Sequence, residues 1–152
     1  MVVERFGRER IRGYVNLATY LQPSGIEVMT ADGNVGQVPY SQVKVVSFVR
    51  ELEGAGVLSE RREFLARPKT AGLWVELRFR DGDRLEGVLP NNLLLLEPLG
   101  YSFSPPESAG NAQRAFVPRA ALDEISVLGV VGGKRRKFDR PETSQIRLFA
   151  EE

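Results

Sequence analysis

One short pattern occurs twice in this chain and limits the folds that it can adopt. The pattern begins at Val38 and again at Val117, and in both places it has the form Val-Pro-x-x-x-Val/Leu-x-x-Val/Ile-Ser. Upstream of it, RIRGYV (10–15) matches RLEGVL (84–89) in the same order. Two matched blocks in one order indicate an internal duplication, so we expect two copies of one small structural unit.

Apolar and polar residues alternate around these blocks, which is typical of half-buried β-strands. The segment LWVELRFR (73–80) shows the alternation most clearly. Asp81-Gly82 then predicts a tight hairpin turn, because this pair tolerates positive φ. Gly87, and Gly13 in the first copy, are expected to mark a bend or bulge. The proline of each Val-Pro pair predicts one helical turn before a closing strand.

This order of elements predicts an all-β fold of two tandem, small SH3-like β-barrels joined by a short helical connector. Ser59 is expected to cap the connector helix, which would end before Pro68. The predicted boundaries are 1–52 for the first barrel, 53–70 for the connector, 71–131 for the second barrel and 132–152 for a basic C-terminal tail.

The second copy also resembles a known family. The residues that carry the resemblance are RPKTAGLWVELRFRDGDRLEGVLPNNLL and NAQRAFVPRAALDEISVLGV, about half of the chain. They are similar to an uncharacterised family of small bacterial proteins with SH3-like barrel repeats and no assigned activity. The resemblance implies a recurring module and does not imply a mechanism.

Composition narrows the possible functions. Hydrophobic residues make up 42% of the chain, which is enough to bury a core, and the net charge of +1 gives no overall attraction to nucleic acid or membrane. Neither Cys nor His occurs, which removes thiolate nucleophiles, the Ser-His-Asp triad and the commonest metal ligands. We therefore expect a cytoplasmic protein that is not an enzyme and uses no cofactor, metal or membrane.

Two groups of side chains have competing interpretations. Asp81, Asp83 and Glu86 are oxygen ligands that suit Mg²⁺ or Ca²⁺, but aspartates also favour a hairpin turn, and we favour the turn. The second group is a predicted binding surface that could stack a base or hold phosphates. The alternative is that the tryptophan of this group covers the interface between the barrels while the arginines stay solvated. The group consists of Trp74, Arg78, Arg80, Arg114 and Arg119.

Four consecutive leucines follow Asn91-Asn92, a turn signal. They cannot all face one core, so one or two should be exposed unless another surface covers them. Exposed apolar patches usually mark interfaces, which makes a homodimer contact plausible.

The tail carries QIRLF, which resembles the pentapeptide by which bacterial proteins bind the DNA sliding clamp. Gln145, Leu148 and Phe149 match the anchor positions, whereas Arg147 departs from the pattern. The alternative is that the tail docks on the protein's own barrels, which would bury its apolar side chains.

These observations favour a non-catalytic binding or scaffolding module whose partner is another protein or a second copy of the chain. The alternative is a nucleic-acid-associated protein that is recruited to the sliding clamp through its tail and has Lys134 to Lys137 as a basic arm.

Overall fold

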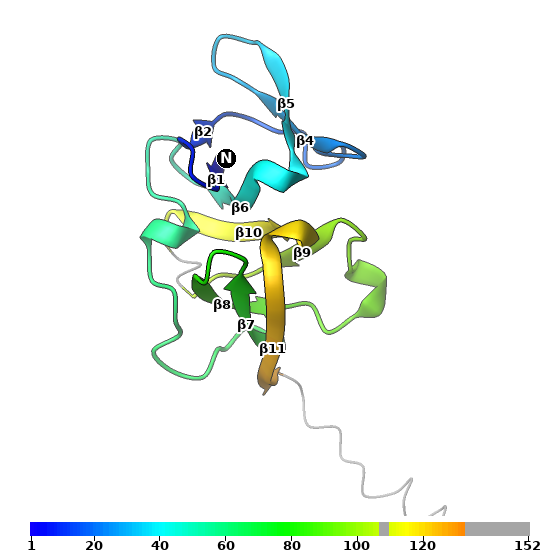
Figure 1. Ribbon diagram of the computed structural model, residues 1–152. Helices are drawn as coiled ribbons and strands as arrows, with labels where there is room; N and C mark the ends of the chain where they lie inside the picture. Colours follow the sequence, from blue (N-terminus) through cyan, green and yellow to red (C-terminus); the bar gives the residue numbers. More distant parts are fainter. Residues whose placement is uncertain (107–109, 133–152) are drawn as a thin grey trace, which may run out of the picture.

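The computed structural model describes residues 1–106 and 110–132 and is built from short strands (Figure 1). The first half contains β1 (Val2–Arg5), β2 (Ile11–Arg12), β3 (Leu21–Gln22), β4 (Gly25–Met29), β5 (Val35–Pro39) and β6 (Val43–Val49). The second half contains β7 (Gly72–Phe79), β8 (Arg84–Leu89), β9 (Gly100–Phe103), β10 (Ala112–Pro118) and β11 (Leu122–Val131). Single 3₁₀ turns are η1 (Tyr40–Gln42), η2 (Val57–Ser59), η3 (Leu93–Leu95) and η4 (Arg119–Ala121). The predicted all-β character is confirmed.

The strands of the described residues form three antiparallel sheets. Their orders are β2-β1-β6-β10-β9, β11-β7-β8 and β3-β4-β5. Single bridges join Tyr14, just after β2, to Met29 of β4, and Ser104, just after β9, to Val88 of β8. The strand pairing thus gives three open sheets, none of which closes on itself, where the sequence predicted two SH3-like β-barrels. The same described part contains no helix that is long and apolar enough to cross a membrane.

Both halves place the Val-Pro pattern at the same structural position. Pro39 ends β5 and Pro118 ends β10, with nearly equal backbone angles of φ −58°, ψ 140° and φ −61°, ψ 144°. Each proline is followed by a 3₁₀ turn and then by a closing strand. That strand pairs with the first strand of its own half, β6 with β1 and β11 with β7.

The two halves share one sheet because β6 also pairs with β10, at the centre of the molecule in Figure 1. Successive residues of these strands face opposite sides of the sheet. Val46 and Phe116 pack into a core formed mainly by the first half. Val45 and Ala115 pack into a core formed mainly by the second half. Each half therefore contributes side chains to the core of the other.

Gly13 and Gly87 are placed where another part of the chain approaches closely. A Cβ atom at Gly13 would lie 2.6 Å from the Met29 carbonyl oxygen, and one at Gly87 would lie 2.5 Å from the Phe103 ring. The register of β8 runs through Gly87 without a shift, with Val75 opposite it. Of the expected bend or bulge, the bulge is absent from β8 at Gly87, and close packing against Phe103 accounts for the glycine.

The predicted connector helix is also wrong. Only η2 is helical between β6 and β7, and the residues that follow Ser59 are irregular. The reason is that tertiary partners take the hydrogen-bonding groups of this segment. The Arg62 carbonyl accepts from the Glu86 N–H at 2.8 Å, and Glu60 Oε1 accepts from the Asn111 N–H at 3.1 Å. In a helix, the Arg62 carbonyl would be needed for the helix's own backbone hydrogen bonds.

Lys44 of β6 fixes the Asp81-Gly82 turn of the second half to the first half. Its Nζ donates to Asp81 at 2.6 Å and to Asp83 at 2.9 Å, and Arg62 also contacts Asp83. Burial alone would lower the pKa of Lys44, but the two carboxylate hydrogen bonds outweigh burial and raise it. Burial alone would raise the pKa of Asp81, but the hydrogen bond from Lys44 acts in the opposite direction, and the pKa of Asp81 is lowered overall. The predicted hairpin turn is present, with Gly82 at φ +89°.

We expect Lys44→Met to lower the free energy of unfolding at neutral pH by about 1–3 kcal/mol, because it removes hydrogen bonds between charged groups. The loss should shrink as the pH falls below 3.8, the ordinary pKa of Asp81. A carboxylate with a lowered pKa stabilises the fold above its unfolded pKa and ceases to do so as the pH falls through its folded pKa. Urea denaturation across pH measures both effects.

Arg84→Met is the matched control, because the Arg84 side chain is 63% exposed in its ion pair with Glu76. Exposed pairs contribute about 0–1 kcal/mol. Equal losses in the two variants, or a loss in Lys44→Met that does not change with pH, would contradict the assigned role of Lys44.

Candidate functional site

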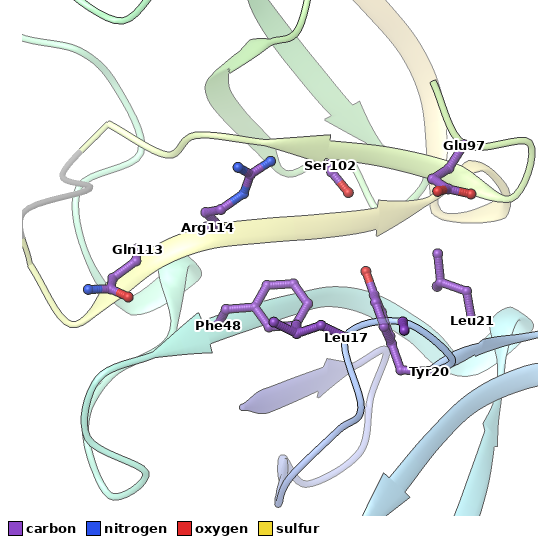
Figure 2. A pocket seen from close by; sticks show the side chains of 9 residues that line it. Leu17, Tyr20, Leu21, Phe48, Glu97, Ser102, Gln113 and Arg114 are labelled. Carbon is purple, nitrogen blue, oxygen red and sulfur yellow. The ribbon is translucent and has the colours of Figure 1, made fainter. Parts of the chain in front are cut away.

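A groove of about 570 Å³ lies between the two halves (Figure 2). Its base is one face of the five-stranded sheet, where Phe48 of β6 stands opposite Arg114 of β10 and Ser102 of β9 stands opposite Phe116. The segment Leu17–Leu21 of the first half forms the facing wall. The groove therefore depends on the pairing of β6 with β10.

The first-half wall is apolar. Leu17, which is 73% exposed, and Leu21 line the groove together with Phe48 and Tyr20. A local turn presents Leu17, because the Asn16 side chain accepts from the Ala18 N–H at 3.0 Å and the Asn16 carbonyl accepts from the Tyr20 N–H at 2.9 Å. This use of a short polar side chain is usual in turns.

Tyr20 anchors this wall to the sheet. Its ring meets Phe48 and Phe116 edge-on, with centroid distances of 5.5 Å and 6.1 Å. Burial raises the pKa of Tyr20 to about 12, although a hydrogen bond with Ser102 acts in the opposite direction. The Tyr20 hydroxyl is therefore protonated at neutral pH and points toward the polar side of the groove (Figure 2).

The second-half wall is polar and carries opposite charges at its two ends. Arg114 and Gln113 of β10 lie at one end, and Glu97, in the loop before β9, lies at the other (Figure 2). Arg114 forms no ion pair with a carboxylate among the residues that the structure describes. The groove thus combines an apolar middle with a cation and an anion available at its ends.

The residues of the predicted binding surface are distributed over several places. Trp74 and Arg78 share the outer face of β7, whereas Arg114 lies in the groove. Trp74 Nε1 donates to Glu86 at 2.7 Å, and its ring meets Phe64 of the connector edge-on at 6.3 Å. The tryptophan contacts described for this structure are thus to the connector and to β8.

Three of the four arginines in that set have partners within the protein. Arg78 pairs with Glu124 at 3.0 Å. The Arg80 guanidinium lies 4.0 Å from the Phe6 ring centroid, and it donates to a carbonyl of the first half, that of Ser41, at 2.6 Å. Arg119 lies 5.3 Å from the Tyr101 ring centroid. Arg114 lines the groove, and Arg119 lines a smaller pocket beside Tyr101.

The four leucines are more exposed than expected. Leu93, Leu94, Leu95 and Leu96 have exposed fractions of 84%, 92%, 62% and 39%. The Asn92 side chain caps η3 by accepting from the Leu94 N–H at 3.0 Å, which holds the leucines in a turn away from both cores. The predicted exposure is confirmed and extends to all four.

The tail residues Gln145, Leu148 and Phe149, and the basic arm from Lys134, lie outside the described residues, so their interpretation stays a prediction. Within the groove, Arg114 is the residue that sequence reasoning identified. Leu17, Tyr20 and Glu97 were missed, because no spacing rule connects such distant positions.

Glu4 is a buried carboxyl outside the groove. Its side chain lies under the connector, with Arg10 at 3.3 Å and Gly56 packed against Oε2, an atom that has no hydrogen-bond partner in the described part of the chain. Burial raises the pKa of Glu4, and the nearby Arg10 offsets this only in part. The charged form of a carboxyl is destabilised when the group is buried and one of its oxygens lacks a hydrogen-bond partner.

We expect Glu4→Gln to become more stable relative to the wild type as the pH rises from 4.5, the ordinary pKa of this carboxyl, toward neutral. A carboxyl whose folded pKa is raised stabilises the fold below its unfolded pKa, and this contribution is lost as the pH rises through the folded pKa. Thermal denaturation across this range measures the difference, with the exposed Glu9→Gln as the control for loss of one charge. A difference that declines with rising pH would show instead that the Arg10 ion pair dominates.

The comparison with known proteins gives one match. The model of a family of unknown function, DUF6982, matches residues 1–129 and so spans both halves, whereas the resemblance seen in the sequence rested on the second half. No curated protein and no solved structure matches the chain. Because the match covers most of its length, this chain belongs to the DUF6982 family.

Proposed function

We propose that this protein is a non-catalytic cytoplasmic binding module whose groove holds an extended segment of a protein partner. The observation that carries the proposal is the groove itself, which has an apolar middle and unlike charges at its ends. A cavity of about 570 Å³ is within the usual size of binding sites, which combine apolar walls with a few oriented polar groups.

The charges and side chains define the chemistry of the partner segment. A leucine or aromatic side chain would pack on the exposed Leu17 and on Phe48, where it would be removed from water. An acidic residue on one side of it would meet Arg114, and a basic residue on the other side would meet Glu97. Charges at such positions set the orientation and specificity of a bound segment.

Two further observations support this assignment. The titratable side chains of the groove include Tyr20, whose pKa of about 12 makes it a poor base or nucleophile at neutral pH. The order of elements in each half, together with the single bridges between sheets, supports the interpretation of each half as a partly open SH3-like barrel. Small barrels of this kind often act as interaction surfaces, and this step is an analogy of fold.

A protein partner is favoured over nucleic acid because most arginines of the predicted binding surface already contact groups within the protein. Arg78, Arg80 and Arg119 contact Glu124, Phe6 and Tyr101 within the protein. A nucleic-acid surface needs several cations that neutralise phosphates together. Arg114 alone at one end of an apolar groove suits a single carboxylate better.

Selection of a displayed random peptide library against the full chain tests the proposal. We expect the enriched peptides to contain a large apolar residue with an acidic neighbour on one side. Arg114→Glu should weaken binding of these peptides about five- to tenfold in fluorescence polarisation, because one charge contact at an open groove is replaced by a repulsion. Arg78→Glu, on the outer face of β7, is the matched control and should bind as the wild type does.

Enriched peptides that bind Arg114→Glu and the wild type equally would place the site elsewhere. Binding of a labelled oligonucleotide that falls steeply with salt and is lost in Arg78→Glu would favour the nucleic-acid alternative. Capture of a purified sliding clamp by the full chain, abolished by Leu148→Ala with Phe149→Ala, would support the prediction made for the tail.

A further inference from the structure

The strand β11 lies at the edge of its sheet. It is the terminal strand in the order β11-β7-β8, and no strand of the described residues pairs along its other side. It runs along the outside of the molecule, away from the shared sheet (Figure 1, orange). A long unpaired edge presents backbone N–H and C=O groups that can pair with another chain, so proteins usually protect such edges with charges, bulges or covering loops.

The second part of β11 carries exposed apolar residues. Val127, Leu128 and Val130 have exposed fractions of 61%, 47% and 56%. The register of β11 against β7 shifts between Val127 and Gly129, so Leu128 is the extra residue of a bulge, and both Val127 and Leu128 are exposed at it.

β6, the equivalent strand of the first half, shows that a second partner strand buries the closing strand. β6 closes its half as β11 does, but β6 pairs with β1 on one side and with β10 on the other. As a result Val45, Val46 and Ser47 are fully buried. The closing strand of this fold is therefore able to hold a strand along both of its sides, and β11 has one of those sides available.

The charges along β11 favour a second copy of the same strand as the partner. Asp123 and Glu124 lie at its start and are exposed. At its other end, Arg67 Nη2 donates to the Val130 carbonyl at 2.7 Å, which places a cation on the open edge. If two copies run antiparallel across a two-fold axis near Val127, the acidic start of each strand meets the basic end of the other.

β5, another terminal strand among the described residues, does not offer this match. β5 is terminal in the order β3-β4-β5, and its exposed residues include Val35, Gly36 and Gln37. None of these is charged, so β5 lacks a complement for either end of β11. A symmetric contact between identical patches is also the commonest form of association between identical chains.

We propose that two copies of this protein pair antiparallel through their β11 edges and form one continuous sheet in the order β8-β7-β11-β11-β7-β8. Burial of Val127, Leu128 and Val130 and the contact between Arg67 and Asp123 of the other copy stabilise the dimer, while Glu124 keeps its ion pair with Arg78. This surface is separate from the groove, so the dimer presents two grooves.

Sedimentation of the full chain over a range of concentrations tests the dimer. We expect a mass approaching twice 16.9 kDa at high concentration. Leu128→Lys with Val130→Lys should raise the dissociation constant at least about tenfold, because it places charges in the paired edge. Val35→Lys, an equally exposed valine on the β5 edge, is the matched control and should leave the dimer intact.

A charge exchange tests the antiparallel register. Arg67→Asp and Asp123→Arg should each weaken the dimer, and the double variant should recover much of the loss. If Arg67 instead protects the edge, Arg67→Asp would strengthen association, which would overturn the assigned register.

A wild type that stays monomeric at all concentrations, or a dimer that is broken by Leu94→Lys and unaffected by the β11 variants, would overturn the proposal. Arg114→Glu should leave the dimer unchanged, so failure here is distinguishable from failure of the groove.

Discussion

The backbone pairing of β6 with β10 is the interaction on which the rest of this structure depends. It joins the closing strand of one half to the fourth strand of the other, and it makes a single sheet with a core on each side. Val45 and Phe116 each enter the core built mainly by the opposite half. Lys44 of the same strand then holds the turn at Asp81 with two hydrogen bonds. Small units that would be marginal alone are thereby stabilised together.

The groove exists because β6 pairs with β10, whereas the open edge exists because β11 has no such second partner. Where β6 and β10 meet, Phe48 and Arg114 stand opposite one another, so an apolar and a charged side chain come together from the two halves. Where β11 lacks the partner that β6 has, apolar residues remain at the surface. The closing strand is paired on both sides in the first half and on one side in the second half. This difference accounts for both proposed binding surfaces.

Local features were predictable from the sequence, and long-range ones were not. Alternation in the segment that became β7, and the Val-Pro pairs before η1 and η4, depend on neighbouring residues and were identified correctly. The helix expected after Ser59 failed because Glu86, distant in the chain, takes the Arg62 carbonyl. The groove could not be foreseen, since Leu17, Phe48 and Arg114 meet only through the register of β6 and β10. The pairing of β6 with β10 was likewise absent from the predicted pair of barrels, because it joins strands of different halves.

The most direct test of this account is native-state hydrogen exchange of the backbone amides. If the shared sheet unites the halves, the slowest amides of β1, β6, β7 and β10 should exchange through one global unfolding event and report the same free energy. The same denaturant dependence should apply to all four strands. Slow amides of β1 and β7 that report clearly different free energies would show that the halves unfold independently, and this would contradict the central role of the β6–β10 pairing.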